Sequence, residues 1–272
     1  MAHRGASRAR AEHTADAYTA AIASGADGLE CDVRLTRDGH LVCVHDRRVN
    51  RTSNGTGVVS EFDLAQLQKL NFSSWREEWP ESADDLLSDN PYLEGVSPDR
   101  DAAGGVLTLQ TLLAMIADAA RPLRLLVETK HPTRYGGLVE KELVQTLHRF
   151  GYGSAATGRP AHGSVAVMSF AAVALRRVRL LDPSLDTVLL QEWLPPGRRD
   201  GRLPAGTTIT GVSLASLHRD PGFVSRAHGR GHLVYAYTVD EPDDIDFVLD
   251  LGVEAIITND PKLAEEIKAG RL

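Results

Sequence analysis

Two carboxylates two residues apart stand at the centre of the most informative part of the sequence. Glu30 and Asp32 fall within an apolar, strand-like run from Leu29 to Leu35. In a β-strand, alternation turns both acids to one face and Cys31 to the other. Two neighbouring acids repel each other unless a cation neutralises them, and a divalent ion with oxygen ligands is the natural candidate. The spacing therefore predicts a metal site.

Two histidines bracket this run. His3 precedes Arg4 at the start of the chain, and His45 precedes Asp46 shortly after the two acids. Imidazole titrates close to neutral pH, so histidine is well suited to take up and release protons during hydrolysis. A metal with a histidine on either side predicts a hydrolase site.

The elements that must position these residues alternate along the chain. We expect strands at residues 1–3, 28–33, 123–128, 165–169, 187–190, 208–214, 233–239 and 255–258, and helices at 12–24, 109–120, 137–150, 171–181, 221–228, 242–251 and 261–269. This pattern predicts the α/β class with a parallel sheet, and eight strands predict a closed (β/α)8 TIM barrel. A doubly wound open sheet is the alternative, but no Gly-rich dinucleotide turn follows an early strand.

One stretch departs from this alternation. The Asp38-Gly39 turn predicts a hairpin whose second arm is residues 41–45. Residues 47–105 then lose apolar periodicity, and we interpret them as a small insertion at the barrel mouth. There Trp75 and Trp79 would serve as packing anchors, or would screen a substrate if the insertion covers the mouth. Residues 1–272 otherwise form one barrel domain.

Composition excludes several classes of protein. The net charge of −7 argues against general nucleic-acid binding and against an electrostatic membrane anchor. No apolar run approaches the roughly 18 residues of a bilayer span, so stable membrane insertion is not expected. Neither a signal peptide nor a disulfide is expected: we interpret Cys31 and Cys43 as small buried hydrophobic residues. The expected location is cytoplasmic, or secreted if a leader precedes this sequence. The oligomeric state is left open.

In a (β/α)8 barrel, catalytic groups gather at the carboxyl ends of the strands. Glu128 and Lys130 share a face at the end of the third expected strand, and Tyr237 lies near the end of the seventh. A charged residue that faces an apolar barrel is costly unless it is paired or bound to a metal. These residues therefore join the candidate site.

Eight segments carry a resemblance to a known family. They are His3-Arg4-Gly5, Gly25–Val33, Thr36-Arg37-Asp38-Gly39, Val44-His45-Asp46, Val127-Glu128-Thr129-Lys130, Ser169-Phe170, Tyr237-Thr238-Val239 and Ile256–Pro261. In this order they resemble the glycerophosphodiester phosphodiesterase family over nearly the whole chain. The resemblance implies a (β/α)8 barrel that hydrolyses glycerophosphodiesters, as small-molecule substrates, to sn-glycerol 3-phosphate and an alcohol.

The same resemblance implies roles for individual residues. Glu30, Asp32 and Glu128 would hold a divalent metal ion, His3 and His45 would form the acid–base pair, and Arg4, Lys130 and Tyr237 would contact the substrate. Three carboxylates suit either Mg²⁺ or Ca²⁺, and the sequence does not choose between them. It also leaves open which histidine is the acid, and whether water or a substrate hydroxyl is the nucleophile.

The chain departs from the family pattern in two places. Ala11-Glu12-His13-Thr14 stands where Pro-Glu-Asn-Thr is usual, and Tyr237 stands where tryptophan is common. We interpret His13, like the other histidines outside the two motifs, as a structural or surface residue. Two alternative functions are weighed: a lysophospholipase D-type activity on lysophospholipids, and a non-catalytic barrel that binds a phosphate ligand.

Overall fold

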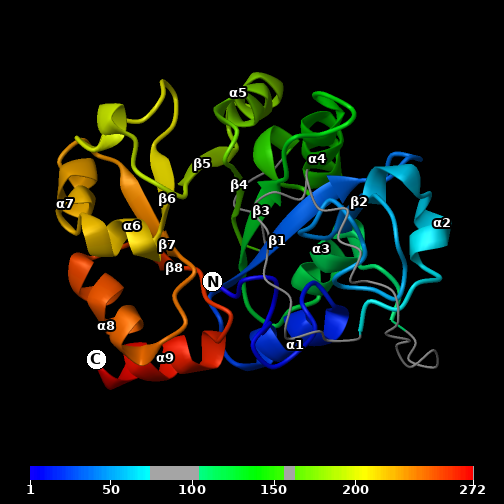
Figure 1. Ribbon diagram of the computed structural model, residues 1–272, viewed down its shortest axis with the longest axis horizontal. Helices are drawn as coiled ribbons and strands as arrows, with labels where there is room; N and C mark the ends of the chain where they lie inside the picture. Colours follow the sequence, from blue (N-terminus) through cyan, green and yellow to red (C-terminus); the bar gives the residue numbers. More distant parts are fainter. Residues whose placement is uncertain (74–103, 156–162, 272) are drawn as a thin grey trace.

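The structure is a computed structural model that describes residues 1–73, 104–155 and 163–271. Trp75 and Trp79 therefore lie outside the described residues. An eight-stranded sheet runs in the order β2-β1-β3-β4-β5-β6-β7-β8 (Figure 1). Its strands are β1 (Gly28–Leu35), β2 (Leu41–Cys43), β3 (Arg124–Thr129), β4 (Val165–Ser169), β5 (Asp186–Gln191), β6 (Ile209–Ser213), β7 (Leu233–Tyr237) and β8 (Ala255–Ile256). Only the β1–β2 pair is antiparallel among these strands, which confirms the expected hairpin.

The first residues of the chain join the two ends of the parallel sheet. Ala2 forms parallel bridges to both Leu29 on β1 and Thr258 just after β8. Its carbonyl accepts a hydrogen bond from the N–H of Glu30 at 2.9 Å, and the N–H of His3 donates to the carbonyl of Thr258 at 2.8 Å. The expected first strand is thus a bridge of one residue, Ala2. This bridge closes the curled sheet, so the (β/α)8 prediction is confirmed.

Helices cover the outside of the sheet (Figure 1). They are α1 (Ala15–Ala23), α3 (Leu109–Ala117), α4 (Leu138–Arg149), α5 (Ala172–Leu181), α6 (Leu214–Arg219), α7 (Gly222–His228), α8 (Pro242–Leu251) and α9 (Pro261–Gly270), with short turns η3 (Gly153–Ala155) and η4 (Pro196–Arg198) between them. Leu29, Cys31 and Val33 of β1 face this shell and are buried. Leu126, Met168 and other inward side chains fill the barrel interior below the site. The two faces of each strand therefore have separate cores.

Several element boundaries differ from the sequence prediction. Side-chain caps explain two of the differences. The helix expected from residue 12 begins at Ala15, because the hydroxyl of Thr14 accepts a hydrogen bond from the N–H of Ala17. The strand expected to reach residue 214 ends at Ser213, whose hydroxyl accepts from the N–H of Ser216. Because of this cap, α6 begins directly after β6 with no loop between them. The apolar periodicity of the strand does not predict this transition.

The described part of the 47–105 stretch is packed. It contains η1 (Val59–Glu61) and α2 (Leu64–Leu67), and its apolar side chains form a small core against the hairpin. The members of that core are Val42, Val44, Val49, Val59, Leu67, Phe72 and Val106. Each short segment supplies only one or two of them, which is why the sequence shows no periodicity here.

Two further expectations concern the whole chain. Cys31 and Cys43 are both buried and free, which confirms that they pack as small hydrophobic residues. Within the part of the chain that the structure describes, no helix is long and apolar enough to cross a membrane.

Candidate active site

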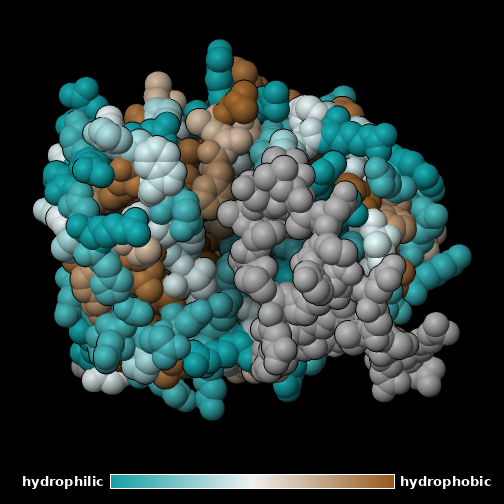
Figure 2. Space-filling view, in the orientation of Figure 1, coloured by the Kyte–Doolittle hydropathy of each residue, from teal (hydrophilic) through white to brown (hydrophobic). Residues whose placement is uncertain are grey.

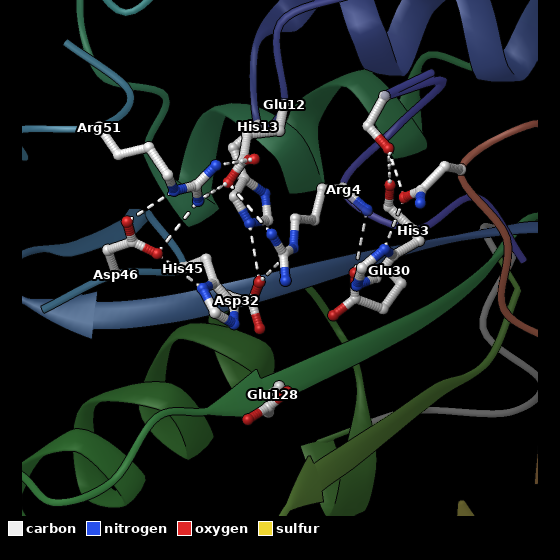
Figure 3. A network of polar contacts seen from close by, with 12 residues as sticks. His3, Arg4, Glu12, His13, Glu30, Asp32, His45, Asp46, Arg51 and Glu128 are labelled. Carbon is white, nitrogen blue, oxygen red and sulfur yellow. Dashed lines mark hydrogen bonds and ion pairs between the residues drawn. The ribbon is translucent and has the colours of Figure 1, made fainter. Parts of the chain in front are cut away.

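Three carboxylates converge at the carboxyl end of the barrel (Figure 3). Glu30 and Asp32 come from β1, and Glu128 from β3, where it is the register partner of Asp32. One oxygen of each lies within 4.8 Å of the others, and all three side chains are buried. The alternation seen in the sequence therefore brings the expected metal ligands together.

The electrostatics of this carboxylate cluster show why it suits a cation. Burial and the neighbouring charge of Asp32 raise the pKa of Glu30, and burial raises the pKa of Glu128 to about 7. Burial also opposes ionisation of Asp32. Nearby positive groups, of which Lys130 has the largest effect, nevertheless hold the pKa of Asp32 well below the usual range. Burial and mutual repulsion therefore oppose the ionised form of two of these three oxygen donors, and a divalent ion would favour it, so the donor set fits such an ion.

Two basic side chains contact the carboxylate cluster. Nζ of Lys130 lies 2.9 Å from Oε1 of Glu128 and 3.1 Å from Oδ1 of Asp32. Nε of Arg4 lies 3.1 Å from Oδ2 of Asp32, and the backbone N–H of Arg4 donates to Oε2 of Glu30 at 3.0 Å. Arg4 has φ of 57°, a left-handed conformation that costs a non-glycine residue about 1 kcal/mol or more. Such strain is typical of functional sites.

His3 is held on one side of the cluster. Its Nδ1 lies 2.7 Å from Oδ1 of Asn259, and the amide of Asn259 donates to Asp240 at 2.7 Å. Because the amide nitrogen is used in this way, Oδ1 is the acceptor and Nδ1 of His3 carries the proton. In the neutral ring, Nε2 of His3 is then the basic nitrogen.

His45 is held by a charged partner. Its Nδ1 lies 2.8 Å from Oδ1 of Asp46, so this nitrogen carries the proton here as well. Burial and the positive charges of Arg4 and Lys130 lower the pKa of His45, although Asp46 acts in the opposite direction. His45 is therefore neutral near pH 7, with Nε2 unprotonated.

The partner of His45 belongs to a chain of ion pairs (Figure 3). Arg51 donates to Asp46 at 2.7 Å, and to both oxygens of Glu12 at 2.7 Å. Glu12 in turn lies 3.3 Å from Nη1 of Arg4. The network joins the loop after β2 to the loop before α1. Sequence reasoning missed Arg51 and gave Glu12 only a role in starting the helix.

His13 also contacts the carboxylate cluster, and the sequence analysis had treated it as a structural residue. Its Nε2 lies 3.0 Å from Oδ2 of Asp32, and its Nδ1 lies 2.8 Å from the hydroxyl of Tyr18. Both side chains are buried. His13 therefore orients a candidate metal ligand. Its place in Glu12-His13-Thr14, where the family has asparagine, was the available signal.

Tyr237 lies at the end of β7, on the apolar side of the mouth. Its hydroxyl lies 3.4 Å from Oε2 of Glu192. Its ring packs edge-on against the ring of Phe170, with 6.1 Å between the two ring centroids. Burial and the charge of Glu192 raise the pKa of Tyr237, so the phenol is neutral. The contacts of Tyr237 thus place it on a wall beside the carboxylate cluster and outside that cluster.

Comparison with known proteins agrees with this geometry. The model of the glycerophosphoryl diester phosphodiesterase family matches residues 3–263. The chain belongs to that family. Among curated members, it is 45% identical over 262 residues to a protein of Mycobacterium tuberculosis named "Probable glycerophosphodiester phosphodiesterase 1", covering 96% of this chain and 89% of the relative. It is 33% identical over 275 residues to a glycerophosphodiester phosphodiesterase of Bacillus subtilis, covering 99% and 86%.

Solved structures of phosphodiesterases have the same fold. A phosphodiesterase of Oleispira antarctica, solved with sn-glycerol-3-phosphate as its product, superposes with a TM-score of 0.79 at 21% identity, covering 98% of this chain and 95% of the other. The glycerophosphodiester phosphodiesterase of Agrobacterium tumefaciens gives 0.72 at 20% identity, covering 97% of each chain. At these identities the likeness concerns the fold. The family match and the curated relatives identify this chain as a glycerophosphodiester phosphodiesterase enzyme.

Proposed function

We propose that this enzyme hydrolyses small glycerophosphodiesters to sn-glycerol 3-phosphate and an alcohol, with a divalent cation held by Glu30, Asp32 and Glu128. The observation that carries the proposal is the convergence of these three buried carboxylates on one point. When bound, the cation supplies positive charge that stabilises the phosphate oxygens as the phosphorus is attacked. Three carboxylates suit either Mg²⁺ or Ca²⁺, so the assay must include both.

Arg4 and Lys130 bind the phosphate in this proposal. Both side chains are largely buried beside the carboxylate cluster, where charge–charge interactions are stronger than in water. A phosphodiester oxygen placed there gains hydrogen bonds from a guanidinium and an ammonium. Because negative charge grows on the non-bridging oxygens during attack, these contacts strengthen in the transition state.

We assign the two histidines by their partners. His45 has the lowered pKa and an unprotonated Nε2 near neutral pH, which suits a base that takes the proton of the nucleophile. His3 is then the acid: in its protonated form, with a second proton on Nε2, it gives that proton to the leaving alkoxide and returns to the neutral ring. The nucleophile is water or a hydroxyl of the substrate's own glycerol, and trapping a cyclic phosphate product would distinguish the two.

A turnover assay tests the proposal. We expect release of sn-glycerol 3-phosphate from glycerophosphocholine in the presence of Mg²⁺ or Ca²⁺, with loss of activity on addition of a chelator. His3→Ala and His45→Ala should each reduce kcat by about 10²-fold or more. His40→Ala is the matched control, because its ring is half exposed and lies 3.8 Å from Asp38 on the hairpin turn. Full activity of both test variants would refute the acid–base assignment.

Lysophospholipids are a second candidate substrate, favoured by one observation. Phe170 and Trp193 at the ends of β4 and β5 are 47% and 63% exposed. Hydrophobic atoms also gather over α5, which follows Phe170 (Figure 2). Preferential turnover of long-chain lysolipids over glycerophosphocholine would support this substrate class. Metal binding without turnover of either class would indicate a phosphate-binding barrel.

A further inference from the structure

A cavity of about 310 Å³ lies beside the candidate active site. One wall is the segment Val58–Glu61, and the other is the β3–α4 loop with Pro132, Arg134 and Tyr135. The hydroxyl of Tyr135 donates to the carbonyl of Ser60 at 2.8 Å, which ties the two walls together. We call this space the basic cavity.

Among the described residues that line the basic cavity, basic side chains outnumber acidic ones. Its basic members are Arg34, Arg47, Lys130 and Arg134, and Glu61 is the one acidic residue among the described lining residues. Glu61 lies 4.0 Å from Arg134, on the exposed rim. The chain has a net charge of −7, so this excess of basic over acidic described residues is a local feature of the cavity. It favours an anionic ligand and disfavours a cationic one.

The basic cavity adjoins the site on the side of His45. Lys130 lines it and also contacts Asp32 and Glu128. Arg34 lies one alternation step beyond Asp32 on β1, and its Nε and Nη2 donate to the carbonyl of His45 at 2.9 and 2.7 Å. A diester with its phosphate at Lys130 can therefore extend one of its two arms into the cavity.

The charge carried by each arm of the diester decides which arm enters the basic cavity. The glycerol arm of a glycerophosphodiester carries only hydroxyl groups, whereas the alcohol arm varies in charge. We propose that the basic cavity binds the alcohol arm and selects alcohols that carry an additional phosphate group. This inference rests on the proposed function. It ranks diesters of phosphorylated alcohols above the choline and ethanolamine esters, whose alcohol arms are cationic, as substrates of the same enzyme.

A matched pair of substrates tests the inference. The pair is glycerophosphoglycerol and the same diester with a phosphate on its terminal hydroxyl. At low salt we expect kcat/KM to be about tenfold higher for the phosphorylated diester, mainly through KM, because charge-assisted contacts are the strong ones. Raising the salt concentration should reduce this ratio. Equal values for the two diesters would overturn the inference and leave the proposed function intact.

Single substitutions show which residues cause the difference in kcat/KM between the two diesters. Arg47→Gln and Arg134→Gln should each bring the ratio of the two kcat/KM values closer to one, and Glu61→Gln should raise it. Arg149→Gln is the control, because Arg149 ends α4 and pairs with Glu142 away from the cavity. A ratio unchanged by all three cavity variants would place the selectivity elsewhere and overturn the inference. No turnover of either diester with any metal would overturn the proposed function itself, and this inference with it.

Discussion

Arg51 donates two hydrogen bonds to the carboxylate of Asp46, at 2.7 and 3.0 Å. The same carboxylate accepts the Nδ1 proton of His45 at 2.8 Å. Burial opposes ionisation of Asp46, but these contacts outweigh burial and lower its pKa. Asp46 is therefore a permanent carboxylate that fixes the tautomer of the catalytic candidate, and Arg51 fixes Asp46 in turn.

The pH dependence of activity follows from His45. A base must be unprotonated, and the pKa of His45 lies below its ordinary value of 6.5. Activity should therefore fall as the pH drops through a value below 6.5, and we expect kcat/KM to show this acidic limb. The carboxylate of Asp46 raises the pKa of His45, so Asp46→Asn should move the limb to lower pH while reducing kcat by about tenfold or more. A limb that moves to higher pH would contradict the assignment of His45 as base.

Arg51 should matter for stability as well as activity. Its side chain is 13% exposed and bridges Glu12 and Asp46. Arg51→Met leaves two buried carboxylates without this partner, and we expect a loss of about 3 kcal/mol in the free energy of unfolding. Urea denaturation measures this loss.

Lowering the pH provides the control for Arg51→Met. The folded-state pKa values of Glu12 and Asp46 lie below their ordinary values of 4.5 and 3.8. The stability that they contribute is present above those ordinary values and is lost as the pH falls through the depressed ones. The difference between wild type and Arg51→Met should therefore shrink in acid. A difference that grows in acid would mean that the ion pairs are not its source.

The site could be predicted where local pattern alone places the residues. Period-two alternation turned Glu30 and Asp32 inward, and parallel pairing brought Glu128 opposite Asp32. Both rules act over a few residues or between neighbouring strands. The convergence of the three carboxylates could therefore be predicted from the sequence, whereas the role of Glu128 as a metal ligand came from the family resemblance and stays a proposal.

The supporting residues could not be predicted, because loop conformation decides their contacts. Asn259 contacts His3, from which it is separated by 256 positions in the sequence. Arg51 contacts Glu12, from which it is separated by 39 positions. His13 turns toward Asp32 in a left-handed conformation with φ of 57°, which its residue type permits but does not determine. The small core between residues 47–73 and the hairpin could not be predicted for a similar reason, since it is assembled from isolated apolar residues.

Metal affinity should depend on each carboxylate of the cluster. We expect Glu30→Gln and Glu128→Gln each to weaken Mg²⁺ or Ca²⁺ binding by about 10²-fold, measured by titration calorimetry, because each replaces an anionic ligand with a neutral one. Glu142→Gln on α4 is the control, since its carboxylate pairs with Arg149. Affinities unchanged in both cluster variants would show that the ion binds elsewhere.

His13 gives the sharpest test of how the carboxylate cluster is oriented. Its Nε2 contacts Oδ2 of Asp32 at 3.0 Å from a backbone with φ of 57°. Asparagine adopts this left-handed conformation more readily than most residues and keeps an N–H donor. His13→Asn should therefore retain metal affinity and kcat to within about threefold.

His13→Ala removes the donor and should reduce metal affinity by about tenfold or more. Tyr18→Phe removes the hydroxyl that contacts the other ring nitrogen of His13 at 2.8 Å and donates to the carbonyl of Glu30 at 3.0 Å. It leaves the contact between His13 and Asp32 in place and serves as the comparison. Thermal unfolding of all three variants separates orientation of Asp32 from general loss of stability. If His13→Asn and His13→Ala lose metal affinity equally, the contact with Asp32 is not what His13 contributes.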